Sequence, residues 1–174
     1  GFGVLWIASL AVGLGLRDDS ASAAIAVPFA LMVAIAAITL VVTMRPGERG
    51  LPRGAHVVQA LIGALLGLFI VITIWITIPE LDVSASADGG CFGVTALMAV
   101  GPLAVAALAL QSSFLSAPAL RGAAIGAVCG LGAAAGITLH CGMVTRGHVL
   151  LAHGTPLLLA TAAGAILGAL RGRA

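Results

Sequence analysis

The sequence contains no lysine and no tyrosine, and it has few charged or aromatic residues of any kind. Charged residues make up 8% of the 174 residues and aromatic residues 4%. A soluble domain averages roughly 25% charged residues. So few polar side chains cannot cover a surface that faces water, which excludes a soluble enzyme, a disordered segment and a nucleic-acid-binding domain. All eight basic residues are arginine, and the net charge is only +2.

What the sequence has instead is apolar residues, at 61%, with a mean hydropathy of +1.21. A helix that crosses a bilayer needs about 20 mostly apolar residues. Six stretches reach or approach this length, and they are Gly1–Leu16, Ala23–Met44, Val57–Ile78, Cys91–Leu110, Gly122–Leu139 and Val149–Leu170. We therefore predict an all-α fold, a polytopic membrane bundle of six transmembrane helices that forms one domain over residues 1–174.

The arginines predict the orientation of this bundle, because short cytoplasmic loops are rich in arginine. With both termini in the cytoplasm, the outer side holds only Arg17 and Arg146. The cytoplasmic side then holds Arg45, Arg49, Arg53, Arg121, Arg171 and Arg173. We predict an N-in, C-in topology. Because the first run is short and position 1 is not methionine, we also expect a native cytoplasmic segment upstream of Gly1.

The predicted spans have no ionisable residue at their middle, which disfavours active transport, because transporters keep such groups along their path. No G-x-S-x-G, H-E-x-x-H or P-loop motif is present, and we predict that the chain is not an enzyme. The interior polar residues are threonines, whose hydroxyls we expect to bond back to their own helix. They are Thr39, Thr73, Thr77, Thr95, Thr138 and Thr161.

Most of the cysteines and histidines fall on one predicted face of the membrane. Cys91 opens the fourth span and Cys141 follows the fifth, so the intervening chain crosses the membrane and returns to the same level. Thiols and imidazoles bind soft and borderline metals such as copper(I), zinc and cadmium, and thiols on an oxidising face can form a disulfide. The candidate metal or redox site is Cys91, Cys141, His140, His148 and His153, with the two cysteines as its core pair.

Each of these residues also has a purely structural interpretation. The two cysteines could be small buried hydrophobic residues, and His140 and His148 could be polar residues at the membrane interface. His153, about one turn into the last span, could be a packing histidine with satisfied hydrogen bonds. His148 and His153 are five residues apart, so an α-helix would not place them on one face.

Two further residues of these types have simpler interpretations. Cys129 lies at the middle of the fifth span among glycine and alanine, which favours a packing role. His56 lies in the arginine-rich loop after the second span, where a solvated interfacial residue is expected.

Glycine is abundant, at 24 residues, and much of it recurs every four positions. This spacing puts small residues on one stripe of a helix, where two backbones can approach closely. We predict packing surfaces rather than ligand-binding loops, with the fifth span at the centre of the bundle. The stripes are Gly122, Gly126 and Gly130; Gly132 and Gly136; Gly164, Gly168 and Gly172; and Gly63 and Gly67.

The second half of the chain carries an ordered set of features. Cys91 starts a span, and the runs LMAVGPLAVAALALQ and RGAAIGAVCGLGAAAGITLHC follow, the latter ending in Leu139-His140-Cys141. A last helix opens on His-Gly in AHGTPLLLATAAGAILGALRGR. From Cys91 to Arg171 the chain resembles the NrsF-like family of bacterial six-span membrane anti-sigma factors.

This resemblance implies a multi-pass protein of the bacterial inner membrane that sequesters an extracytoplasmic-function sigma factor on its cytoplasmic side. It implies release of that factor when periplasmic cysteines, here Cys91 and Cys141, sense a metal or an oxidant. The expected partners are the sigma factor and the lipid bilayer, with no direct contact to nucleic acid. No resident cofactor is expected, only a heavy-metal ion held transiently as a signal.

Two other functional classes remain open. A membrane thiol–disulfide oxidoreductase would relay electrons through two cysteine pairs, whereas this chain has three cysteines, and quinone-coupled activity would identify it. A small transporter or channel would need a polar stripe through the bundle, and a solute-flux assay in liposomes would identify it.

Overall fold

The computed structural model describes residues 6, 7, 9, 13, 15, 16, 22–44, 53–79, 89–109, 117–143 and 145–172. Its named elements are all helical, which confirms the all-α prediction for this part of the chain. They are α2 (Ala23–Met44), α3 (Arg53–Ile76), α4 (Gly89–Ala109), α5 (Pro118–Thr138), α6 (Arg146–His148), the π-helical turn η2 (Val149–Gly154) and α7 (Thr155–Arg171).

Within the described residues, five helices are long and apolar enough to cross a membrane, and the last of them joins α6, η2 and α7 into one span, Arg146–Arg171. The predicted spans agree with these helices to within four residues at each end, and α2 has the predicted bounds. The predicted span Gly1–Leu16 lies mostly outside the described residues.

Two residues that the sequence assigns to loops lie in helices. Pro118 falls in the loop before the predicted span Gly122–Leu139, but in the structure it opens α5, where a residue without a backbone N–H is well accommodated. His56 was also expected in a loop, yet it lies in the first turn of α3, where its side chain is exposed.

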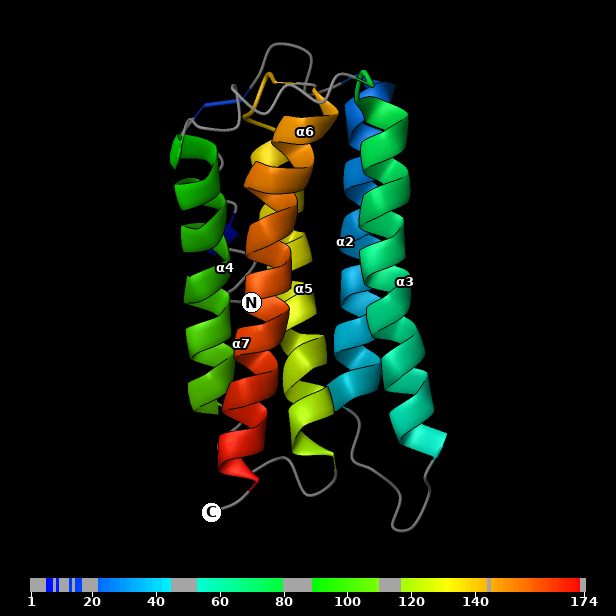
Figure 1. The fold of residues 1–174 in the computed structure, drawn as a ribbon, viewed down its shortest axis with the longest axis vertical. Coiled ribbons are helices and arrows are strands. Elements are labelled where there is room, and N and C mark those ends of the chain that lie inside the picture. The colour runs from blue at the N-terminus through cyan, green and yellow to red at the C-terminus, as the bar shows by residue number, and fades with distance from the viewer. Residues whose placement is uncertain are drawn as a thin grey trace.

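The long helices run alternately up and down, as Figure 1 shows. One end of the bundle gathers the end of α3, the start of α4, the end of α5 and the short helix α6. We call it the cysteine end, because Cys91 lies in the first turn of α4 and Cys141 follows α5. The opposite end gathers the last turns of α2, α4 and α7 and the first turns of α3 and α5.

The outer surface of the bundle is apolar. Large hydrophobic side chains point away from the core on every long helix except α5, including Val71 and Trp75 on α3, Val100 on α4 and Leu158 on α7. A soluble monomer rarely exposes this much apolar surface, whereas the lipid tails of a bilayer are a natural solvent for such a surface. The surface therefore fits a multi-pass membrane protein.

The central position predicted for the fifth span is confirmed. Helix α5 contacts α2, α3, α4 and α7. In its most apolar stretch 72% of the residues are buried, against 28% in α2, α3 and α4. Small residues allow this burial, because α5 is built largely from glycine and alanine.

The glycines of α5 and α7 form a close backbone contact. A Cβ atom added at Gly122 would lie 2.1 Å from the carbonyl oxygen of Gly164, and one added at Gly126 would lie 2.0 Å from that of Ala160. No larger residue fits at such distances, so the predicted packing role of these stripes is confirmed.

The predicted stripe on the third span is wrong. A Cβ atom at Gly63 or Gly67 would meet no atom within 4 Å in the described part of the chain. Helix α3 instead packs through larger side chains, because its buried face carries Leu65, Phe69 and Ile72.

The threonine hydroxyls follow the prediction in four cases and depart from it in two. Thr39 and Thr73 have buried hydroxyl groups with no hydrogen-bond partner among the described residues. The other four donate to a carbonyl three or four residues earlier in their own helix or at its end, and these are Thr77 to Thr73, Thr95 to Cys91 (2.7 Å), Thr138 to Ala135 (2.7 Å) and Thr161 to Leu157 (2.8 Å).

Candidate metal centre

The structure brings Cys91 and Cys141 together at the cysteine end. The backbone N–H of Cys141 donates to the Ile137 carbonyl over 2.8 Å, so the last turn of α5 fixes the position of this residue. The Sγ atoms of Cys91 and Cys141 lie 3.6 Å apart, although 50 residues separate them in the sequence. This distance is too long for a disulfide bond, whose sulfur atoms are about 2.05 Å apart.

The surroundings of the two thiols are apolar. Cys141 is buried, and Cys91 is half-buried. Both belong to a hydrophobic cluster with Met98 and Ile137. In such surroundings, charge on the thiols is stable only beside an opposite charge.

His148 lies next to Cys141, with its Nε2 atom 3.4 Å from the Cys141 Sγ. Its side chain is fully buried at the end of α6. The start of α6 is held in place because the backbone N–H of Arg146 donates to the Ile78 carbonyl, just after α3, over 3.2 Å. Thus the end of α3, which is distant in the sequence, helps to hold this imidazole against the Cys141 thiol.

The π-helical turn η2 brings His153 to the same place. In a π-helix the backbone hydrogen bonds join residues five apart, so residues at this spacing lie on one face. The His148 and His153 rings therefore meet edge to face, with centroids 5.4 Å apart and planes at 82°. The expectation that these histidines do not share a helix face was wrong, because it assumed α-helical geometry. The signal in the sequence was the five-residue spacing, which indicates a shared face only if the segment forms a π-turn.

His153 is almost completely buried, with 1% of its side chain exposed. Neither of its ring nitrogens has a hydrogen-bond partner among the described residues. This overturns the interpretation of His153 as a histidine with satisfied hydrogen bonds. A buried polar group without a partner costs about 1–3 kcal/mol, so its retention calls for a physical reason.

Four of the five predicted site residues form one group. The ligand atoms of Cys91, Cys141, His148 and His153 all lie within 4.8 Å of one another. Two thiols and two imidazoles are a donor set that soft and borderline metal ions prefer. The four ligand atoms of this group are two sulfurs and two nitrogens.

The fifth predicted residue, His140, lies outside this group. Its Nδ1 atom is 2.9 Å from the carbonyl oxygen of Gly15. His140 therefore contacts the amino-terminal part of the chain, although it is next to Cys141 in the sequence.

The third cysteine lies apart from the site. Cys129 is buried in a separate hydrophobic cluster with Leu103 and Ile125, as its predicted packing role requires. It is 12 residues before Cys141, or roughly 18 Å along the chain in helical rise.

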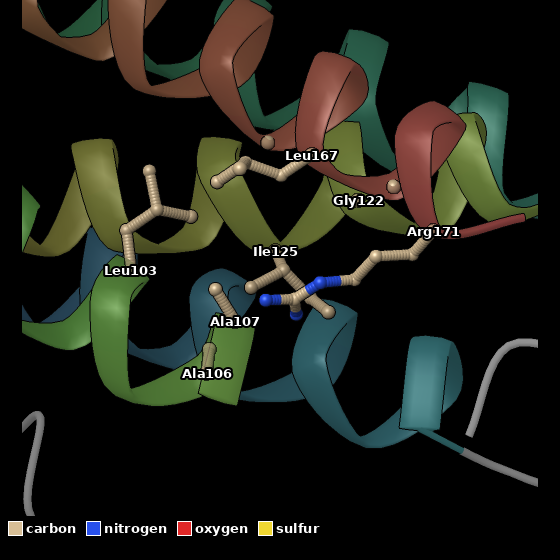
Figure 2. Close-up of a pocket in the computed structure, with 9 residues that line it drawn as sticks. Leu103, Ala106, Ala107, Gly122, Ile125, Leu167 and Arg171 are labelled. Carbon is tan, nitrogen blue, oxygen red and sulfur yellow. The ribbon is translucent and has the colours of Figure 1, made fainter. Parts of the chain in front are cut away.

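A pocket lies nearer the opposite end of the bundle, between α4, α5 and α7 (Figure 2). Among its lining residues the charged one is Arg171, whose guanidinium lies beside Ile125 in the close-up. The pocket offers neither thiol nor imidazole, so its lining is unsuited to a metal ion.

No protein-family model, curated protein or solved structure matches this chain.

Mild oxidation is expected to join Cys91 to Cys141 within one chain. The two sulfur atoms need to approach by only about 1.5 Å to reach bonding distance. Diamide treatment of the purified protein should remove two hydrogen atoms from its mass, and peptide mapping should place the bond between these residues. Cys129→Ala should form the same bond, and Cys141→Ser should not. A bond from Cys129 to either residue would contradict the described packing.

Proposed function

We propose that this chain is a multi-pass membrane regulator that senses a metal ion or an oxidant at its cysteine end and controls a sigma factor at its opposite end. The observation that carries the proposal is the 3.6 Å approach of the Cys91 and Cys141 sulfur atoms. Two thiols at this distance react together with a soft metal or an oxidant, whereas isolated thiols react singly.

The sigma factor enters this proposal through the resemblance to NrsF-like anti-sigma factors. In that arrangement the protein spans the bacterial inner membrane six times, with both termini in the cytoplasm. The cysteine end then faces the periplasm, where thiols are open to oxidation and metal ions arrive first. The opposite end faces the cytoplasm and the sigma factor.

Helix α5 provides the physical connection between the two ends. Its 21 residues extend over about 30 Å, close to the thickness of the hydrocarbon core. Near its start, the Arg121 Nη1 atom donates to the Thr43 carbonyl in the last turn of α2, over 3.1 Å. Past its end lies Cys141. A shift of α5 at the cysteine end would therefore reach the end of α2.

The contact between α5 and α7 makes a gradual structural response to the signal unfavourable. The backbones touch at Gly122, Gly126 and Gly164, so the two helices move as one body. Close-packed helices have few alternative arrangements, and a local change at the thiols is converted into one discrete displacement. Such a displacement would weaken the binding of a sigma factor at the cytoplasmic end.

The proposal is tested with a reporter gene driven by the partner sigma factor. Cys91→Ser and Cys141→Ser are each expected to abolish induction by cadmium, chromate or peroxide, because each leaves a single thiol in the group. Cys129→Ser is the matched control and should respond like the native chain. Immunoblots of membrane fractions verify equal protein levels. Unchanged induction in both site variants would rule the proposal out.

A further inference from the structure

The cysteine end holds a histidine that the thiol chemistry does not explain. His153 is 1% exposed, and both of its ring nitrogens lack a hydrogen-bond partner among the described residues. A thiol pair that only forms and breaks a disulfide has no need of this imidazole. The helix nevertheless adopts a six-residue π-turn that brings it beside His148. Single π-turns within α-helices are frequent at functional sites.

We propose that Cys91, Cys141, His148 and His153 form a closed, four-coordinate site for a divalent d10 cation of the zinc class, and that the π-turn supplies its two imidazoles. This ion site rests on the metal-sensing part of the proposed function and names its ligand, but ion binding requires nothing of the sigma factor.

The measured distances agree with this coordination. Zinc–sulfur bonds of about 2.3 Å and zinc–nitrogen bonds of about 2.0–2.1 Å at tetrahedral angles put two sulfurs about 3.8 Å apart and a sulfur and a nitrogen about 3.6 Å apart. The Cys91 and Cys141 sulfurs lie 3.6 Å apart, and the Cys141 sulfur lies 3.4 Å from the His148 Nε2. All four ligand atoms lie within 4.8 Å of one another. Small side-chain movements complete the tetrahedron.

Charge decides between a divalent and a monovalent ion. Two thiolates and two neutral imidazoles carry a charge of −2, so a divalent cation makes the complex neutral. A monovalent copper ion would leave one negative charge in apolar surroundings that include Met98 and Ile137, which is costly. On binding, each thiol gives up its proton and the imidazoles bind in their neutral form.

The bound ion has no free coordination position for a substrate, but an ion can reach the site. Four protein ligands leave no position for water, which is the arrangement of a structural or sensing site rather than a catalytic one. Cys141, His148 and His153 are buried, while Cys91 is half-buried in the first turn of α4. The ion therefore enters past Cys91. Its binding ties α4, the end of α5 and the π-turn together.

The test uses the purified full chain in detergent, stripped of metal under reducing conditions. Zinc is expected to bind at one ion per chain. Cobalt(II), a spectroscopic substitute, should give the intense visible bands of a tetrahedral ion and the near-ultraviolet bands of thiolate-to-cobalt charge transfer. A weak octahedral spectrum from the native chain would overturn the proposal, and this readout requires no variant.

Variants identify the ligands. His148→Ala and His153→Ala should each lower the zinc affinity at least about 100-fold, since losing even an outer contact of a ligand costs 10–100-fold. Cys141→Ser should remove about half of the charge-transfer intensity, in proportion to the thiolates lost. His140→Ala and Cys129→Ser are matched controls and should bind as the native chain does.

The other outcomes separate this site from the proposed function. Unchanged zinc affinity and cobalt spectra in both histidine variants would overturn the four-residue site. Binding of copper(I) without zinc or cobalt would overturn the divalent assignment. Zinc binding together with unchanged induction in Cys91→Ser and Cys141→Ser would support the site and contradict the sigma-factor proposal. Reporter induction that depends on the two thiols, in a chain that binds no metal, would contradict the ion site and support the sigma-factor proposal.

Discussion

Gly126→Leu is expected to separate α5 from α7 and to prevent the bundle from folding stably. The Cβ atom alone would lie 2.0 Å from the Ala160 carbonyl oxygen, and the rest of the side chain would enter the adjacent backbone. Extra methylene groups in a packed core cost about 1–3 kcal/mol, and here rigid backbone cannot move aside, so we expect a loss of at least about 3 kcal/mol. Denaturation with sodium dodecyl sulfate in mixed micelles measures this loss.

Gly63→Leu is the matched control, because a Cβ atom added at this position of α3 would meet no atom of the described residues within 4 Å. A leucine there faces lipid and should leave the unfolding transition close to that of the native chain. The two glycines have the same sequence context, a small-residue stripe on an apolar helix. Equal destabilisation by the two substitutions would show that α5 and α7 do not pack as described.

His153→Leu is expected to have opposite effects on the metal-free and the zinc-bound protein. Without metal, the substitution removes a buried imidazole whose ring nitrogens have no partner among the described residues. We therefore expect the free energy of unfolding to rise by about 1–3 kcal/mol. With zinc at 100 times its dissociation constant, the native chain gains about 2.7 kcal/mol, and the variant should lose this gain. Thermal unfolding with a chelator and with zinc measures both effects.

His140→Leu is the control for this experiment. His140 lies at the same end of the bundle, but its Nδ1 atom contacts the Gly15 carbonyl and it is outside the four-residue group. This variant should keep the full stabilisation by zinc. If His153→Leu lowers the stability of the metal-free protein instead, then His153 is not an unsatisfied group, and this result contradicts its role as a ligand.

The spans were predictable because they depend on local properties. The length of an apolar run is set by the thickness of the bilayer, so α2 could be bounded from the sequence at Ala23 and Met44. Helix ends were less predictable, because a proline such as Pro118 can either break a helix or begin one.

The candidate site was predictable in composition but not in arrangement. Antiparallel spans bring Cys91 and Cys141 to one level, and the sequence indicates this directly. It offers no means of separating His140 from His148, since both lie near Cys141 along the chain. The two histidines differ in the residues that they contact. His140 contacts Gly15, whereas His148 contacts Cys141 because Arg146 is tied to Ile78.

Composition and spacing by themselves determined that this chain is apolar enough for a membrane, where its long helices run, and that two thiols share one end. The tertiary structure alone decided that the Gly126 stripe is a helix contact while the Gly63 stripe is not. It also decided that His148 and His153 meet through a π-turn. The reason is that the length of an apolar run is a property of one segment. By contrast, the neighbour that a glycine stripe faces, and the residues that a π-turn brings together, depend on which distant helix packs against them.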